Sequence, residues 1–268
     1  MVDLFLGELH LGPVKAVLFD KDGTLSHSEP MLTLLAEARI AAALQLHDPT
    51  ARWGAGTAER LEMLLRQAYG LSPAGLDPAG TIAVAARDHN LISTATVLAL
   101  LGHGWPEALA ISEEIFRRTD HHHGSGSSLV PQPTAGLKSL LRDLQEAGVR
   151  CAVISNDATS GIEAFLNDHD LAAPFSALWS ADHQPRKPDP GAVHQLCQAL
   201  GVAPAECALI GDANSDLRMA DAAGVAVVLG YCGGWSVPLP LDPRFLRLRH
   251  WQELGVGRAG SAPSAGRA

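Results

Sequence analysis

The sequence lacks the cysteine pattern of a small domain held together by disulfides or zinc. Its four cysteines, Cys151, Cys197, Cys207 and Cys232, are scattered, and no two of them form a C-x-x-C pair. Such spacing argues against a disulfide framework or a zinc site and is typical of a reducing compartment. Long apolar runs are also missing. The segment 91–101 is too short for a membrane span, which needs roughly 18 apolar residues, so we expect a buried helix there.

Positive charge is scarce too. Lys and Arg number 20 against 29 Asp and Glu, which gives a formal net charge of −9. No basic run and no alternation of basic with aromatic residues occurs, so a nucleic-acid backbone is not expected as a partner. Asp3 and Glu8 lie in the N-terminal region where a secretory signal would carry positive charge and a longer apolar core. We therefore expect a cytoplasmic protein without a membrane partner.

Short apolar segments that end in small or polar residues recur along the chain. They are "VKAVLFD" from residue 14, "VRCAVISND" from 149, "SALWSAD" from 176, "CALIGD" from 207 and "VAVVLG" from 225. Helix-length segments between the later ones end at Gly148, Gly201 and Gly224, which suit the left-handed position after a helix. Short apolar strands that alternate with helices predict an α/β fold, a Rossmann-like three-layer core around a parallel sheet.

The segment 30–128 differs from its flanks in composition and periodicity: it is rich in Ala and Leu, and its apolar residues recur at the spacing of helices. The polar sequences "SHSEP" before it and "HHHGSGSS" after it are typical of hinges. We therefore predict an all-helical cap domain inserted into the α/β domain. The predicted boundaries are 1–28 and 129–256 for the α/β core, 29–128 for the cap and 257–268 for a disordered tail.

Polar side chains follow three of the predicted strands, where each strand ends. They are Asp20 and Asp22 after the first, Ser155 and Asn156 after "VI", and Asp212 after "IG". Because the carboxyl ends of parallel strands meet at one edge of a sheet, we expect these residues to form one site. Carboxylates so close together need a cation among them, and an all-oxygen cluster with few protein ligands suits Mg²⁺. Lys187 would add positive charge from the protein itself, with its neighbour Arg186 as the alternative.

These segments, in this order, resemble the motifs of the haloacid dehalogenase superfamily in its phosphatase branch. The first motif stands as "FDKDGTL" (19–25), the second as "VISN" (153–156), the third as "KPDP" (187–190) and the fourth as "GDANSD" (211–216). The fourth continues into "LRMADAAG", in the style of phosphoglycolate phosphatase-like members. A lone D-x-D would be weak evidence, whereas four motifs in order, each at a strand end or loop, are specific.

The resemblance implies an enzyme that forms an aspartyl-phosphate. Asp20 would attack the phosphorus, which divides one difficult displacement into two easier ones. Asp22, expected on the same side of an extended chain, would protonate the leaving alcohol and then deprotonate the attacking water. Dehalogenating members lack this second acid because a leaving halide needs no proton. The presence of Asp22 therefore favours phosphoester chemistry.

The resemblance also implies which residues bind the metal and the phosphoryl group. Mg²⁺ would be held by Asp20, by the backbone carbonyl of Asp22 and by Asp212, with Asp216 orienting Lys187 or a metal-bound water. Ser155, Asn156 and Lys187 would bind the transferring group, whose charge spreads over three oxygens.

Two residues depart from the family pattern. Lys21 stands between the paired acids, where the family usually has an apolar residue, and strand alternation predicts that its side chain points away from Asp20 and Asp22. Asp157 follows "ISN", where the family often has Lys. Neither change disables the implied mechanism, but both leave the charge of the substrate open.

The predicted cap limits the choice of substrate. It contains no lysine, which argues against phosphonoacetaldehyde hydrolases, because that branch forms a Schiff base through a cap lysine. Arg52 lies in the Gly-broken loop "ARWGAGT", where similar caps reach the substrate, and it is a candidate for binding a second anionic group; a surface arginine is the competing interpretation. Three consecutive histidines, His121–His123, are expected to point in different directions, so we interpret them as a polar hinge or a fortuitous tag-like run and not as a metal site.

The function predicted from these residues is a Mg²⁺-dependent phosphatase that acts on a small phosphorylated metabolite, such as phosphoglycolate. A β-phosphoglucomutase-like phosphomutase would share every core motif, so it stays as the alternative. A non-catalytic binding protein on the same fold predicts the loss of at least one motif residue, and none is lost. A monomer and a homodimer are both compatible with the sequence.

Overall fold

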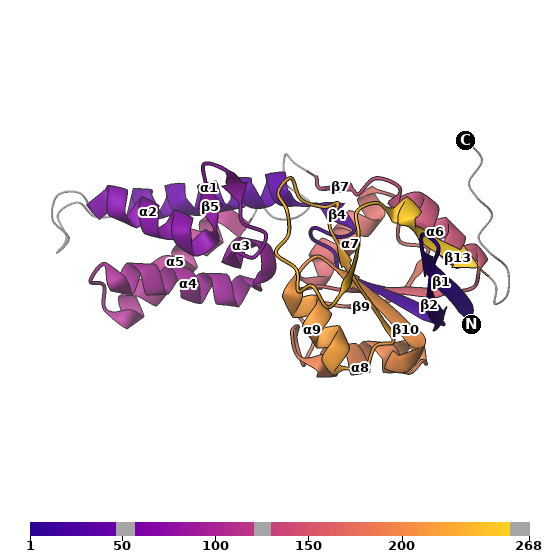
Figure 1. Cartoon of the computed structure of the whole chain (residues 1–268). Helices are drawn as coiled ribbons and strands as arrows, with labels where there is room; N and C mark the ends of the chain where they lie inside the picture. Colours follow the sequence, from indigo (N-terminus) through magenta and orange to yellow (C-terminus); the bar gives the residue numbers. More distant parts are fainter. Residues whose placement is uncertain (47–56, 121–129, 258–268) are drawn as a thin grey trace. The chain divides into compact units, whose positions relative to one another are not determined.

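The computed structural model describes residues 1–46, 57–120 and 130–257 of the chain (Figure 1). The backbone divides into two compact units, a core unit of Met1–His27 with Gln132–Ala268 and a cap unit of Ser28–Pro131. Arg52, the run His121–His123 and nearly all of the predicted tail lie outside the described residues. None of the described helices is both long and apolar enough to cross a membrane.

A six-stranded parallel sheet forms the centre of the core unit: the parallel sheet and five of its strands were predicted, whereas the edge strand β12 (Leu246–Leu248) was not. Its strand order is β12-β11-β10-β3-β8-β9, and every neighbouring pair is parallel. The strands are β3 (Ala16–Phe19), β8 (Arg150–Ile154), β9 (Phe175–Trp179), β10 (Cys207–Gly211), β11 (Val227–Tyr231) and β12 (Leu246–Leu248). Every residue of β3 and β10 is buried, which explains why both strands are continuously apolar.

Helices cover both faces of this sheet and complete the three predicted layers (Figure 1). They are α6 (Leu137–Glu146), α7 (Thr159–Asp168), α8 (Pro190–Leu200) and α9 (Asn214–Ala222). Val17 and Phe19 of β3 pack with α6 and α7, whereas Ala16 and Leu18 pack with α8 and α9. The alternation along β3 thus supplies two hydrophobic cores. The predicted left-handed glycines are confirmed: φ is 75° at Gly148, 67° at Gly201 and 77° at Gly224.

A second, antiparallel sheet was not predicted. It consists of β1 (Val2–Leu6), β2 (Leu9–Val14) and β13 (Leu254–Gly257), in the order β13-β1-β2. Its strands contain Gly12, Pro13 and Gly255, and β1 pairs with β13 from the far end of the chain as well as with β2, so no pattern along the sequence indicates the pairing of β1 with β13. Gly257, which we assigned to the tail, pairs with Asp3 in this sheet. Leu4 of β1 is fully buried in the same core as Val17.

Beside these sheets, Trp251 in the 3₁₀ turn Trp251–Glu253 fills the core unit. Its ring stacks on Tyr231 at a centroid distance of 4.1 Å and meets Phe19 edge-on at 5.9 Å. A two-stranded ladder of β4 (Ser26–His27) and β7 (Gln132–Pro133) joins the two segments that lead to and from the cap unit. A second 3₁₀ turn, Pro204–Glu206, precedes β10.

The cap unit is helical, as predicted. Its helices are α1 (Glu29–Leu46), α2 (Thr57–Tyr69), α3 (Thr81–Val84), α4 (Arg87–Leu100) and α5 (Trp105–Thr119). The segment 91–101 falls almost entirely in α4 and buries Thr94, Ala95, Val97 and Leu98. The structure adds one feature to the all-helical prediction, a two-stranded hairpin of β5 (Leu71–Ser72) and β6 (Gly75–Leu76).

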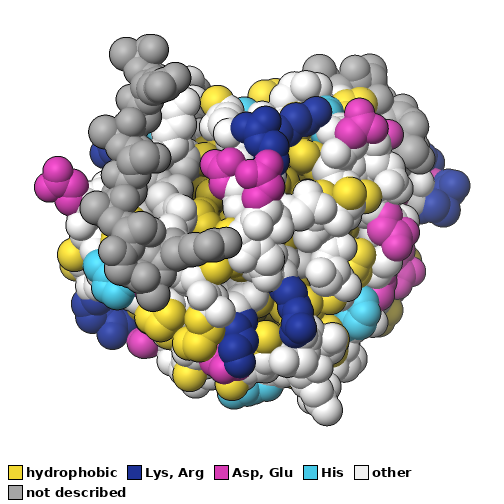
Figure 2. Space-filling model, turned by 90° about the vertical axis from the view of Figure 1, so that its right-hand side faces the viewer, with side chains coloured by type: hydrophobic (Ala, Val, Ile, Leu, Met, Phe, Trp, Pro, Cys, Tyr) yellow, Lys and Arg dark blue, Asp and Glu magenta, His cyan; other side chains and the backbone are white. Residues whose placement is uncertain are grey.

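Charged side chains of both signs are interspersed on the surface drawn in Figure 2. Lys and Arg side chains stand beside Asp and Glu, and the hydrophobic side chains between them are scattered. Among the described residues of this face, no continuous basic strip is visible.

Candidate active site

Three neighbouring strands of the central sheet bring the predicted polar residues to one edge. Asp20 follows β3, Ser155 follows β8 and Asp212 follows β10, and β3 lies between the other two strands. Because all three strands are parallel, their carboxyl ends meet at the same edge.

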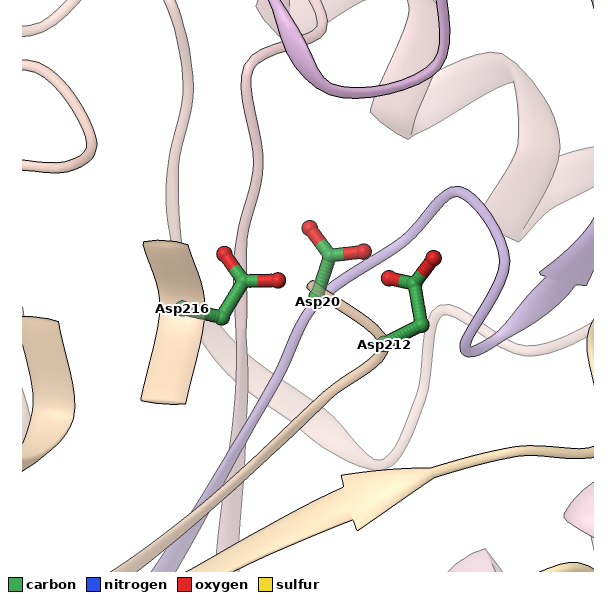
Figure 3. A group of neighbouring side chains, drawn as sticks. All are labelled: Asp20, Asp212 and Asp216. Carbon is green, nitrogen blue, oxygen red and sulfur yellow. The ribbon is translucent and has the colours of Figure 1, made fainter. Parts of the chain in front are cut away.

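A cluster of three buried carboxylates lies there. Asp20, Asp212 and Asp216 each place a carboxylate oxygen within 4.8 Å of the others. Figure 3 shows the three carboxylates directed to the same side, with Asp20 between Asp216 and Asp212. Asp216 comes from the first turn of α9. This set of oxygen donors is the kind that Mg²⁺ prefers.

The cluster is costly to keep ionised. Burial raises the pKa of Asp20 to about 6, against the opposing effect of the Lys187 ammonium, and repulsion from Asp216 adds to the rise. Burial also raises the pKa of Asp212 well above its ordinary range, with further contributions from Asp20 and Asp216. A divalent cation would lower both pKa values and stabilise the charged forms. The electrostatics therefore fit a metal site at this edge.

Lys187 neutralises one side of the cluster. Its Nζ lies 2.6 Å from Oδ1 of Asp20 and 2.6 Å from Oδ1 of Asp216, and it donates to the carbonyl oxygen of Ile154 at 3.2 Å. Burial by itself would lower the pKa of Lys187, but the two acids raise it above the ordinary value. The ammonium group thus bridges Asp20 and Asp216 and gives these two carboxylates a cationic partner from the protein itself.

The loop between β9 and α8 holds Lys187 in this position. Trp179 at the end of β9 donates its indole N–H to the carbonyl oxygen of Pro185 at 2.8 Å, and its ring packs on His183 at 4.7 Å. Asp189 caps α8 by accepting from the backbone N–H of Gly191 at 2.7 Å. The sequence "KPDP" thus places a lysine just before a well-defined helix start.

Asp212 is fixed by two hydrogen-bond donors. Thr24 donates its hydroxyl to Oδ1 at 3.2 Å, and Trp235 donates its indole N–H to Oδ2 at 2.6 Å. Gly23 lies next to this junction with φ of 77°, and a Cβ there would collide with Asp212 and Trp235. Only glycine fits at this position.

Lys21 and Asp157, the two departures from the family pattern, contact each other. Lys21 Nζ lies 2.9 Å from Oδ2 of Asp157 and 2.7 Å from Oδ1 of Asp22, and only 3% of its side chain is exposed. The prediction that Lys21 points away from Asp22 is therefore wrong, because β3 ends at Phe19 and the chain turns, so strand alternation no longer applies. The added cation and the added anion compensate each other.

Comparisons with known proteins identify the family. Residues 14–224 match the haloacid dehalogenase-like hydrolase family. The chain belongs to this family. A phosphoglycolate phosphatase of Rhodospirillum rubrum is 33% identical, and the alignment covers 93% of this chain and 97% of that protein. A phosphoglycolate phosphatase of Thiobacillus denitrificans is 29% identical over 80% of this chain and 82% of its own length.

A solved structure of a predicted phosphoglycolate phosphatase from Haemophilus somnus shares the fold. Its TM-score is 0.61 at 18% sequence identity, and the match covers 87% of this chain and 93% of that one. At this identity the likeness supports the architecture of the haloacid dehalogenase-like fold and not a substrate.

The other predicted site residues lie outside the carboxylate cluster. Ser155 is buried, and its Oγ accepts the backbone N–H of Asp157 at 3.1 Å, whereas Asn156 is half-buried. Asp22 does not join the carboxylate cluster of Figure 3, because its carboxylate faces Lys21. The backbone-carbonyl contact expected of Asp22 stays a prediction, and Arg52 lies outside the described residues.

Sequence reasoning missed one residue that touches the site of this haloacid dehalogenase-like hydrolase. Trp235 follows β11 in "GYCGGW", far from every motif, and nothing in its neighbours marks it as a partner of Asp212. The glycine pair before it is the one local signal, because adjacent glycines often allow a close approach of two backbones.

Proposed function

We propose that the chain is a Mg²⁺-dependent phosphatase that hydrolyses a small phosphomonoester of the phosphoglycolate type through an aspartyl-phosphate on Asp20. The class of the reaction, phosphoric monoester hydrolysis, follows from the family and from the relatives named above. The observation that carries the proposal is the position of Asp20, at a central strand end, in contact with Lys187 and beside Asp212.

In the proposed first step, a carboxylate oxygen of Asp20 attacks the phosphorus and the phosphorus–oxygen bond to the alcohol breaks. The alcohol oxygen takes a proton from Asp22 as it leaves. In the second step, Asp22 takes a proton from water, the water oxygen attacks the phosphorus, and inorganic phosphate and free Asp20 are released. Lys187 and Ser155 would stabilise the negative charge on the transferring phosphoryl group. The Nζ of Lys187 already contacts Oδ1 of Asp20, the attacking residue.

Asp20, Asp212 and the backbone carbonyl of Asp22 would hold the Mg²⁺, and Asp216 would keep Lys187 in place. The fit rests on the donor set, which consists of carboxylate oxygens in the described cluster, and on the raised pKa values of Asp20 and Asp212. Bound Mg²⁺ would supply positive charge for a phosphoryl oxygen.

The test is phosphate release from a panel of phosphomonoesters that includes 2-phosphoglycolate, glycerol phosphates and sugar phosphates. We expect release that stops when Mg²⁺ is removed with a chelator and returns when Mg²⁺ is added in excess, because the carboxylate cluster needs a cation. Release that is indifferent to the chelator would contradict the metal role of Asp212. Conversion of a sugar phosphate to its isomer without release would favour the phosphomutase instead.

A second prediction concerns Arg52 and the charge of the substrate. If Arg52 binds the second anionic group, Arg52→Ala should raise KM for 2-phosphoglycolate by about 10-fold or more, the usual loss for a hydrogen bond to a charged group. KM for p-nitrophenyl phosphate, which has no carboxylate, should stay unchanged. Arg60→Ala, at an exposed position of α2, is the matched control. Equal changes for both substrates would exclude this role of Arg52.

A further inference from the structure

Trp235 makes a contact with the carboxylate cluster that no family motif assigns. It lies in the long connection between β11 and β12, and its side chain is buried, with 8% of the residue exposed. Its Nε1 donates to Oδ2 of Asp212 at 2.6 Å. A hydrogen bond from an N–H donor stabilises the charged form of a carboxylate, so this contact opposes the effect of burial on Asp212.

The surrounding backbone is built to permit this contact. Gly234 lies against the backbone carbonyl of Gly23, where a Cβ on Gly234 would collide with it. A Cβ on Gly23 would in turn meet the indole nitrogen and Oδ2 of Asp212. Two glycines therefore bring the first-motif turn, the fourth-motif acid and Trp235 together.

The segment that carries Trp235 is also anchored next to Asp212. The side chain of Asn214, at the start of α9, donates to the carbonyl oxygen of Pro240 at 2.9 Å and accepts from the backbone N–H of Asp242 at 2.6 Å. The connection is thus tied to the helix that follows Asp212, and the indole is not a loosely placed surface group.

The two donors on Asp212 define how its carboxylate can bind a cation. Thr24 occupies one acceptor position of Oδ1 and Trp235 one position of Oδ2. Each carboxylate oxygen has about two such positions, so each keeps one for a metal. An indole N–H only donates, so it holds the carboxylate in one orientation and leaves its charge intact.

We propose that Trp235 is a positioning residue for the metal site, which holds Asp212 in the orientation that binds Mg²⁺. The inference rests on the proposed function, because it assumes that Asp212 is a metal ligand. Hydrogen bonds to metal-ligating carboxylates typically change metal affinity by about 10–100-fold. The indole should also report the occupancy of the site, since its N–H contacts Asp212, which would hold the ion.

The test measures Mg²⁺ binding directly by calorimetry on metal-free protein. Trp235→Phe keeps the ring and removes the N–H, so we expect Kd for Mg²⁺ to rise by about 10–100-fold, while kcat at saturating Mg²⁺ falls much less. Trp235→His restores a ring N–H and should bind Mg²⁺ more tightly than Trp235→Phe. Trp105→Phe, at an exposed position of the cap unit, is the control and should bind like the wild type.

Tryptophan fluorescence supplies a second measurement on the same three proteins. Mg²⁺ should shift the emission of the wild type and of Trp105→Phe by the same amount, and the shift should be smaller in Trp235→Phe, which keeps Trp179. Equal Kd values for the wild type and Trp235→Phe, with a Mg²⁺-dependent emission change of the same size in both, would overturn the role of Trp235. No Mg²⁺ binding by the wild type would overturn the proposed metal site itself, so the two failures are distinguishable.

Discussion

Replacing Asp20 by asparagine should lower kcat on the order of 10⁴-fold or more while the protein stays folded. The amide cannot act as the nucleophile, and losing the nucleophile removes the covalent route. Folding should be little affected because asparagine has the same shape, and because Lys187 keeps Asp216 and the carbonyl oxygen of Ile154 as partners. Phosphate release under saturating substrate and Mg²⁺ measures the activity, and thermal unfolding measures the fold.

The matched control for this variant is Asp143→Asn, on the exposed side of α6. It makes the same chemical change far from the cluster, so its kcat should equal that of the wild type. Brief incubation with a phosphate-labelled substrate should label the wild type and Asp143→Asn but not Asp20→Asn. Labelling or turnover of Asp20→Asn at the level of the control would remove Asp20 from the role of nucleophile.

The second large effect is expected from Lys21→Met. This change leaves the carboxylates of Asp22 and Asp157 without their shared cation, and the side chains of these acids are only 17% and 10% exposed. Removing one partner from a buried ion pair typically costs about 3–5 kcal/mol, and we expect a value near the lower end because the site is partly solvated. Urea unfolding should show this loss, and kcat should fall as well because Asp22 loses the group that orients it.

A pair of substitutions separates the charge arrangement from simple packing. Lys21→Leu together with Asp157→Lys moves the cation to the other position and restores the residue types that the family resemblance led us to expect. If the cation itself matters, the double variant should recover both stability and kcat relative to Lys21→Leu alone. If the effects of the two substitutions on the free energy of unfolding and on kcat are simply additive, Lys21 and Asp157 do not interact.

The sequence predicted the parts of the molecule that depend on local order and on fixed spacing. Apolar runs identified five of the six strands of the parallel sheet, because strands buried on both faces have no polar side to alternate with, whereas the edge strand β12 was missed. Glycines at the helix ends were predictable since only that residue adopts a left-handed conformation without strain. Residues that end parallel strands must meet at one edge, so Asp20 and Asp212 were expected together, with Lys187 as the nearby cation, and the structure brings the three together.

Other features depend on contacts between residues far apart in the chain, and only the tertiary structure decided them. The antiparallel sheet pairs β1 with β13 from opposite ends of the described chain, and no local pattern indicates that pairing. The contact of Lys21 with Asp22 and Asp157 arises because the chain turns after Phe19, which ends the alternation on which the prediction relied. Trp235 contacts Asp212 because Gly23 and Gly234 allow two backbone segments to approach closely. The sequence around a glycine does not show which distant segment lies against it.

Local features and long-range contacts differ in predictability for one physical reason. Backbone conformation and the burial of a strand follow from neighbouring residues, so a sequence by itself determined the α/β core, the helical insert and the residues of the carboxylate cluster in this protein. The partners of a buried charge or of an indole N–H are chosen by packing across the whole fold. Only the tertiary structure therefore shows that Asp157 compensates the charge of Lys21. The same holds for the hydrogen bond that Trp235 donates to Asp212.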